Sequence, residues 1–339
     1  MNTIYYLNKL VDKQDLTGDE IRSLFAAVSK GELDPIQIAA VLIALRMKGE
    51  TVEEIGSLIQ EMRSHIVDFP AYPDAIDTCG TGGDGTGTFN ISTTVAFVAA
   101  GAGIQIIKHG NKAASSKCGS ADVLSELGVN IMLTPEQANN VFKKVGMVFL
   151  YASLYHPAMK YIAPVRKSLG TRTVFNFLGP FLNPAQVKRQ LIGVPNAELA
   201  EKLAKVAATL QYEHAVIVSS NSGMDEMDVS GATTIYEIRG KSVLKKSVNP
   251  QTLGFKKTNS QEMHGGSMAE NAQIIRDILS GKKGAKRDVV VLNSAYALYV
   301  AGKVKDIRDG MRLAELSIDS GEAKNILDNL VKETRKYEK

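Results

Sequence analysis

The chain contains little cysteine and no long apolar run. Cys79 and Cys118 are the only cysteines among 339 residues, and neither has a second cysteine at metal-ligand spacing. This excludes a disulfide scaffold and fits a reducing compartment. Residues 1–12 lack the basic start, the apolar core and the small-residue cleavage site of a secretory signal. No run of about 18 apolar residues occurs, so we expect a soluble, cytoplasmic protein with no membrane partner.

The chain also lacks a strong excess of one charge. Its formal net charge is +4, and the basic clusters at 245–246, 256–257 and 282–287 carry no interleaved aromatic residues on which bases could stack. We interpret these clusters as a solvated face and expect no nucleic-acid partner. No Ser-His-Asp or Cys-His set stands out, so covalent catalysis is not indicated. We expect no single catalytic residue, and a reaction that depends on positioning and electrostatics.

The most informative segment is the glycine-rich stretch 77–93 (DTCGTGGDGTGTFNIST), which has five glycines within residues 80–87. It lies between a predicted short strand and a helix that begins near Ser92. Glycine has no Cβ atom, so successive backbone N–H groups can turn inward, and the helix start adds the positive end of its dipole. The pattern predicts a site for a phosphate or a pyrophosphate.

Two familiar phosphate loops do not fit this segment. Residues 80–85 match G-x-G-x-x-G, but a dinucleotide site needs an acidic residue about 20 positions later, and here the next predicted strand ends in Lys108. No G-K-[S/T] closes the glycine run, which excludes the nucleotide-triphosphate loop. The remaining pattern is a glycine loop at the end of one predicted strand and a lysine at the end of the next. We interpret Lys108 as a phosphate clamp.

The chain is predicted to have an all-helical start and a larger α/β part. Capping boxes at 17–20 and 51–54, and a proline-containing start at 34–37, predict several short helices. After 70–73 (PAYP), strands, loops and helices alternate, which predicts a central, mostly parallel sheet flanked by helices. Strands are expected at 75–78, 104–107, 146–150, 215–219, 234–238 and 288–292. Helices are expected at 92–101, 159–178, 196–210, 271–279, 294–300 and 307–319.

The helix that begins at Asp34 is apolar on almost every side. Its apolar residues include Ile36, Ile38, Ala39, Val41, Leu42, Ile43 and Leu45. A small subdomain cannot comfortably cover such a helix, so it is either a core helix or part of a subunit interface. Because two-fold pairing is the commonest closed arrangement, we predict a homodimer through the N-terminal helices.

Three loops follow strands of the predicted parallel sheet: 80–87, 108–111 and 219–226. Ligands of open parallel sheets bind beyond the carboxyl ends of the strands, so these loops can meet at one site. The adjacent carboxylates Asp225 and Glu226 indicate either a Mg²⁺ site shared with substrate phosphates or an exposed acidic turn. Ser92 can cap its helix or bind a second Mg²⁺. Asp84 can orient that metal or simply close a turn.

Motifs in a fixed order run along nearly the whole chain. They are 80–84 (GTGGD), 90–93 (NIST), 108–111 (KHGN), 115–116 (SS), 119–122 (GSAD), 156–159 (HPAM), Arg166, 172–184 (RTVFNFLGPFLNP), 223–226 (GMDE) and 270–272 (ENA). In this order they resemble the anthranilate phosphoribosyltransferase family. The resemblance implies transfer of the 5-phosphoribosyl group from phosphoribosyl pyrophosphate (PRPP) to the amino group of anthranilate, in tryptophan biosynthesis. It also implies Mg²⁺ as cofactor, with two ions per subunit.

The same resemblance implies domains and binding residues. A helical domain at 1–70, joined by 159–182, would accompany an α/β domain at 71–158 and 183–339. The residues implied for PRPP are Gly80, Thr81, Gly82, Gly83, Asp84, Thr88, Asn90, Ser92, Thr93, Lys108, Ser116 and Ser120. Those implied for anthranilate are Gly80, His109, Asn111, His156 and Arg166, and those for the metal are Ser92, Asp225 and Glu226. Considered singly, the two histidines are more often structural, and Arg166 is equally an ordinary ion-pair partner.

Three positions depart from the family pattern. Lys112 stands where arginine is usual, Cys118 where serine is common and Ser294 where alanine is usual. Lysine at position 112 keeps the positive charge but lacks the planar guanidinium of arginine, which affects only the finer phosphate contacts. Two alternatives remain. A pyrimidine nucleoside phosphorylase shares the fold but lacks the Asp-Glu pair and this glycine run, and a non-enzymatic nucleic-acid-binding relative would have lost Arg166, Asn111 or the carboxylate pair.

Overall fold

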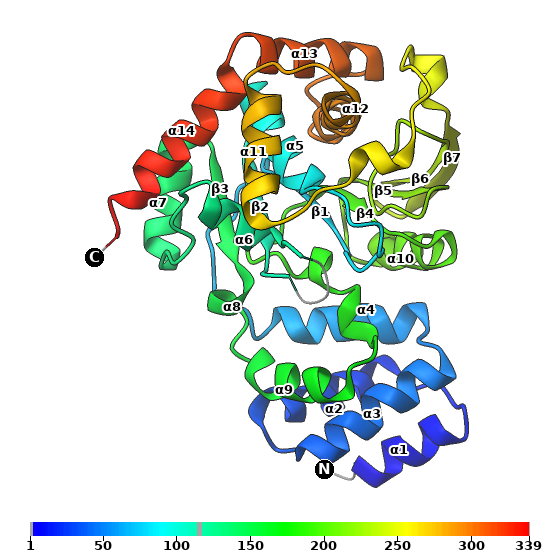
Figure 1. The fold of residues 1–339 in the computed structure, drawn as a ribbon. Helices are drawn as coiled ribbons and strands as arrows, with labels where there is room; N and C mark the ends of the chain where they lie inside the picture. Colours follow the sequence, from blue (N-terminus) through cyan, green and yellow to red (C-terminus); the bar gives the residue numbers. More distant parts are fainter. Residues whose placement is uncertain (1–2, 114–116, 339) are drawn as a thin grey trace.

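The computed structural model describes residues 3–113 and 117–338, which form a small helical part and a larger α/β part (Figure 1). The helical part contains α1 (Thr3–Val11), α2 (Gly18–Lys30), α3 (Pro35–Lys48) and α4 (Val52–Arg63). A later segment, α9 (Met159–Leu169), packs against α2 and α3. The chain therefore returns to its N-terminal helices after it has entered the sheet.

The predicted starts of α2, α3 and α4 are confirmed. The side chains of Thr17, Asp34 and Thr51 each accept hydrogen bonds from backbone N–H groups of the first helical turn, and the side chain three residues later bonds back to the cap. A cap of this kind is typically worth about 1 kcal/mol. Local sequence thus fixes where three of the N-terminal helices begin.

The α/β part is built on a seven-stranded sheet in the order β3-β2-β1-β4-β5-β6-β7. The strands are β1 (Ile76–Gly80), β2 (Ile106–Gly110), β3 (Met147–Tyr151), β4 (Arg189–Gly193), β5 (His214–Ser220), β6 (Thr233–Arg239) and β7 (Ser242–Val248). The neighbouring strands β3, β2, β1, β4 and β5 pair in parallel. Strand β6 pairs antiparallel with both β5 and β7. The mostly parallel sheet is confirmed, and the carboxyl ends of its five parallel strands lie at one edge.

Helices cover both faces of this sheet. On one side are α5 (Ile91–Gly101), α11 (Met268–Leu279), α12 (Ala285–Val300), α13 (Ile307–Asp319) and α14 (Glu322–Arg335), and on the other is α10 (Ala197–Thr209). Alternate residues of β5 point to opposite sides, as strand geometry requires. Val216 and Val218 join the core with α12, whereas Ala215 and Ile217 join the core that α10 shares with the helical part.

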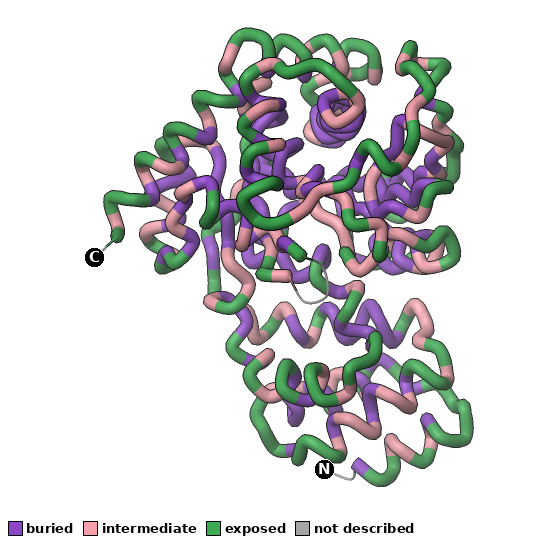
Figure 2. Tube along the Cα trace, viewed as in Figure 1, coloured by how far each residue is buried: buried purple, intermediate pink, exposed green. Residues whose placement is uncertain are grey.

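Shorter elements complete the structure. They are α6 (Ser120–Glu126), α7 (Pro135–Val145), α8 (Ala152–Tyr155) and 3₁₀ turns at Val174–Asn176, Gly179–Leu182, Pro250–Leu253 and Ser260–Met263. Buried residues concentrate in the sheet and along α12, while the outer helices expose one side (Figure 2). None of the helices within residues 3–113 and 117–338 is long and apolar enough to cross a membrane.

Two secondary-structure predictions were wrong. Residues 288–292, predicted as a strand, lie inside α12, and the helix predicted at 294–300 is the second half of the same helix. The run Val289, Val290 and Val291 favours a strand by local propensity, but α12 packs between the sheet, α5 and α13 and needs apolar residues on every side. The helix predicted at 159–178 ends at Leu169, with Gly170 in a left-handed conformation. Strands β4 and β7 were not predicted.

Candidate active site

The glycine-rich loop connects the carboxyl end of β1 to the start of α5. Its backbone φ is positive at Gly82 (67°), Gly83 (70°), Gly85 (76°) and Gly87 (68°), a conformation that costs other residues about 1–2 kcal/mol each. The N–H of Thr81 donates to the carbonyl of Gly193 on β4 at 2.9 Å. These glycines therefore let the chain reverse its direction several times while it stays attached to the sheet edge.

Three carboxylates meet beside this loop, and we call them the carboxylate trio: Asp84, Asp225 and Glu226. One ligand oxygen of each lies within 4.8 Å of the others. Asp225 is only 6% exposed, and its Oδ2 accepts the N–H of Gly82 at 2.7 Å. A Cβ atom at Gly80 would overlap that carboxylate, so any other residue there would displace the Asp225 side chain. The pair Asp225 and Glu226 is thus folded against the glycine loop and does not form an exposed turn.

The electrostatics of the trio favour a bound cation. Burial, and secondly the charge of Asp84, raise the pKa of Asp225 to about 6. Burial, and secondly the charge of Asp225, raise the pKa of Glu226 well above its ordinary value. The Oε2 atom of Glu226 is buried without a hydrogen-bond partner in the described part of the chain. Like charges in a buried site repel, and a hard divalent cation with oxygen ligands removes that repulsion.

Lys108 is the cation on the other side of the loop. It lies on β2 and is 1% exposed. Its Nζ donates to the carbonyl of Thr78 and to Oγ of Ser92, the latter at 3.3 Å. The ammonium therefore lies between β1 and the first turn of α5. It adds positive charge to the helix end where an anion is expected to bind.

The start of α5 supplies further polar groups. Asn90 occupies the N-cap position, and Thr93 lies in the first turn with a buried Oγ1 that has no hydrogen-bond partner among the described residues. Thr88 forms an isolated antiparallel bridge with His264. Thr88, Asn90, Ser92 and Thr93 were all among the residues expected to bind PRPP, and they lie on one loop and one helix turn.

The remaining phosphate candidates follow β2. Ser120 is the first residue of α6, and its Oγ donates to the carbonyl of Asn111 at 3.4 Å. The N–H groups of Ala113 and Gly119 both donate to Oδ2 of Asp122 at 2.9 Å, so one carboxylate holds both residues. Ser116, predicted to bind PRPP, lies outside the described residues, as does Ser115.

The residues expected to bind anthranilate, besides Gly80 at the end of β1, lie on or beside β2, α8 and α9. His109 on β2 and His156 after α8 are buried, and their Nε2 atoms are 2.9 Å apart. Burial lowers the pKa of both, to about 4 for His156, so the pair is neutral and one imidazole donates to the other. Asn111 is exposed just beyond β2. Arg166 on α9 lies over the ring of Phe175, at 5.9 Å from its centroid, and burial lowers its pKa.

Three residues that were not predicted from the sequence connect the parts of the site. Arg172 donates to the carbonyl of Gly83 in the glycine loop. Asn183 donates to the buried Asp77 on β1 at 2.9 Å, and burial raises the pKa of Asp77 to about 6. Asn293 on α12 exchanges hydrogen bonds with the backbone of Met227, next to the carboxylate trio. Arg172 and Asn183 belong to motif 172–184, for which the sequence indicates no role in binding.

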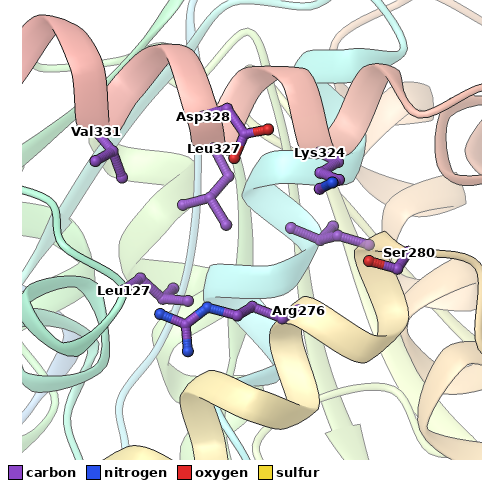
Figure 3. A pocket seen from close by; sticks show the side chains of 8 residues that line it. Leu127, Arg276, Ser280, Lys324, Leu327, Asp328 and Val331 are labelled. Carbon is purple, nitrogen blue, oxygen red and sulfur yellow. The ribbon is translucent and has the colours of Figure 1, made fainter.

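A pocket of about 300 Å³ lies elsewhere, between α11 and α14 (Figure 3). Its floor is apolar and its rim carries exposed charged side chains; the lining residues are Leu127, Arg276, Leu279, Ser280, Lys324, Leu327, Asp328 and Val331. None of the residues predicted for the site lines it. The pocket is therefore separate from the edge of the sheet where the glycine loop and the carboxylate trio meet.

The chain is similar to known proteins over nearly its whole length. A model of the glycosyl transferase family, a/b domain, matches residues 72–324, and a model of the glycosyl transferase family, helical bundle domain, matches residues 4–66. An anthranilate phosphoribosyltransferase of Dehalococcoides mccartyi is 46% identical over 328 residues, covering 96% of each chain. One of Acetivibrio thermocellus is 46% identical over 332 residues, covering 98% of this chain and 96% of that protein.

Solved structures agree with these relatives. The crystal structure of anthranilate phosphoribosyltransferase from Thermus thermophilus has a TM-score of 0.92 and 36% identity, and covers 99% of this chain and 100% of that chain. The enzyme from Saccharomyces cerevisiae in complex with PRPP and Mg has a TM-score of 0.90 and 29% identity, with 98% of both chains covered. The same yeast enzyme has also been solved with 4-fluoroanthranilate, at a TM-score of 0.88 and 27% identity.

Proposed function

The chain belongs to the anthranilate phosphoribosyltransferase family, and on this premise we propose that it transfers the 5-phosphoribosyl group from PRPP to the amino group of anthranilate. The products are N-(5-phosphoribosyl)anthranilate and pyrophosphate, in the pathway to tryptophan. The new bond joins the anthranilate nitrogen to C1 of the ribose, and the bond from C1 to the pyrophosphate oxygen breaks.

The observation that carries this proposal is the hydrogen bond from the N–H of Gly82 to Asp225. It joins the glycine loop to the carboxylate trio, so that anion-binding backbone and cation-binding carboxylates share one place. PRPP carries a diphosphate that binds divalent cations, and it needs both kinds of group at once. A site for a nucleotide base or a peptide has no comparable need.

Mg²⁺ fits the residues that are present. Asp225 and Glu226 offer oxygen ligands, and the buried, unpartnered Oε2 of Glu226 supports a metal position there. We propose two ions per subunit, with Ser92 contributing to the second. Bound Mg²⁺ neutralises charge on the departing pyrophosphate.

The protein's own groups position the two substrates. Backbone N–H groups of the glycine loop and of the first turn of α5, with Asn90, Thr93, Lys108 and Ser120, hold the diphosphate and the phosphoribosyl group. Anthranilate brings its own nucleophilic amine, so no covalent intermediate is required. The rate enhancement then comes from orientation and from electrostatic stabilisation of an oxocarbenium-like ribose.

We assign anthranilate to the other side of the site. Arg166 offers a planar fork that matches a carboxylate. We also assign Gly80, Asn111 and the neutral pair His109 and His156 to the anthranilate site. Because both histidines are buried and uncharged, they select for shape and hydrogen bonding and do not act as cations.

The proposal is tested by following anthranilate fluorescence in the presence of PRPP and Mg²⁺. Anthranilate should be consumed only when both are present, and excess chelator should stop the reaction. Uridine with inorganic phosphate is the control for a nucleoside phosphorylase and should give no turnover. Consumption that continues undiminished in excess chelator, or phosphorolysis of uridine, would refute the assignment.

The N-terminal helices carry an apolar surface that supports a homodimer. Ile36 and Met47 on α3 are 81% and 79% exposed, and Ile4 and Val11 on the neighbouring α1 are 67% and 70% exposed. Exposed apolar residues gathered on packed helices are typical of interfaces. We propose two-fold pairing through α1 and α3, a domain division at 1–70 with 159–182, and a cytoplasmic location that keeps the two free cysteines reduced.

A further inference from the structure

Motif 270–272 has no role in the proposed reaction. Its middle residue, Asn271, is 2% exposed and lies in the first turn of α11. The segment 263–271, which leads into this helix, runs along the glycine loop: the N–H of Phe89 donates to the carbonyl of Met263 at 3.0 Å, and the N–H of Gly265 donates to the carbonyl of Gly87 at 2.9 Å. A Cβ atom at Gly265 would collide with the backbone of Phe89.

A directed chain of hydrogen bonds crosses from this segment to the start of α5. The N–H of Gly266 donates to Oδ1 of Asn271 at 2.9 Å, Nδ2 of Asn271 donates to Oδ1 of Asn90 at 3.2 Å, and Nδ2 of Asn90 donates to the carbonyl of Cys118 at 3.1 Å. A backbone N–H begins the chain and a backbone carbonyl ends it. Both side-chain amides can therefore take only one orientation.

This orientation changes what Asn90 does at the helix start. An asparagine at the N-cap ordinarily accepts hydrogen bonds from the second or third backbone N–H of its helix. Here those N–H groups belong to Ser92 and Thr93, and the side chain of Asn90 makes no such cap bond in the described structure. Its oxygen is engaged by Asn271 instead, so the helix end stays open for an anion.

We propose that Asn271 is a positioning residue that keeps Asn90 from capping its own helix and thereby keeps the diphosphate site at the start of α5 open. The proposal depends on the proposed function in one respect: the diphosphate binds at the start of α5. When the donor at position 271 is lost, the oxygen of Asn90 is free to accept from Ser92 or Thr93. The protein's own amide then competes with the substrate for the same N–H groups.

The test measures binding of inorganic pyrophosphate with Mg²⁺ by titration calorimetry, and steady-state kinetics. Asn271→Ala should weaken pyrophosphate binding about tenfold, the size of an N-cap interaction, and raise the KM for PRPP without changing the KM for anthranilate. Asn271→Asp has the same shape without the donor and should also weaken binding. If one of these two variants does not fold, the other still tests the proposal.

Two further variants separate positioning from general loosening. Ser267→Ala removes the cap of α11 in the same segment but leaves the contact of Asn271 with Asn90, so it should bind pyrophosphate like the wild type at a comparable loss of thermal stability. In an Asn90→Ala background, which cannot cap, Asn271→Ala should have no additional effect. Wild-type affinity in Asn271→Ala, an equal loss in Ser267→Ala, or additive losses in the double variant would overturn the proposal. A wild-type chain that does not bind pyrophosphate at all would instead refute the proposed function.

Discussion

Replacing Asp225 with asparagine should make the metal-free protein more stable and the enzyme much less active. The two side chains have the same shape, and asparagine can still accept the hydrogen bond from Gly82 through its oxygen. Its amino group can donate to the unpartnered Oε2 of Glu226. The substitution removes one charge from three that crowd within 4.8 Å.

The size of the stability gain follows from the pKa of Asp225. Burial and the charge of Asp84 raise this pKa from 3.8 to about 6, which corresponds to about 3 kcal/mol. Because the carboxyl is harder to ionise in the folded state than in the unfolded chain, its charge destabilises the fold. The penalty is absent below about pH 4 and complete above about pH 6.

Urea unfolding in excess chelator measures the effect. At about pH 8, Asp225→Asn should be more stable than the wild type by about 3 kcal/mol, and the gain should shrink at about pH 5. Turnover should fall about a hundredfold or more, since a charged ligand of the metal is lost. Asp228→Asn is the matched control, because Asp228 is buried nearby but accepts two hydrogen bonds from Ser230, and it should lose stability. A less stable Asp225→Asn protein, or one that keeps its activity, would refute the reasoning.

Three other predictions concern the acceptor site, the histidines and the assembly. Arg166→Ala should raise the KM for anthranilate about tenfold or more, with little change in the KM for PRPP. The control Lys167→Ala, on the same helix, should change neither KM. Equal effects on both substrates would indicate a structural role for Arg166. The imidazole NMR signals of His109 and His156 should not titrate between about pH 8 and pH 5.5, because burial lowers both pKa values, to about 4 for His156. Ile36→Glu should convert a dimer into monomers in light scattering, whereas Leu244→Glu on the exposed strand β7 should not, and a monomeric wild type would contradict the dimer.

Much of the fold was predictable because its signals are local. Caps at Thr17, Asp34 and Thr51 lie within four residues of the groups they bind. Alternation of strands and helices after residue 70 was enough to predict a parallel sheet. One of the exceptions, Val289 to Leu292 in α12, shows where local reasoning ends: these residues favour a strand, but packing on all sides stabilises a helix.

The candidate site was predictable in outline for a different reason. Parallel strands end at one edge of a sheet, so the loops after β1, β2 and β5 had to lie near one another once the sheet was inferred. The residues that connect these loops gave no such signal. Arg172 reaches Gly83 and Asn271 reaches Asn90 through contacts between segments far apart in the sequence. Such contacts follow no periodicity that a single sequence displays.

Buried polar groups without hydrogen-bond partners at the site lower the stability of the fold, and they also indicate how the site binds its substrate. Among the described residues, eight buried side-chain polar atoms have no hydrogen-bond partner, and three of them belong to Thr81, Thr93 and Glu226. Each such atom costs about 1–3 kcal/mol when it is left unpaired. Three of them on or beside the glycine loop are difficult to explain as packing defects, because the adjacent cores are continuous and apolar. Groups that lack partners in the protein alone can gain them from a phosphorylated substrate and its cation, so binding free energy becomes available where the ribose bond must break.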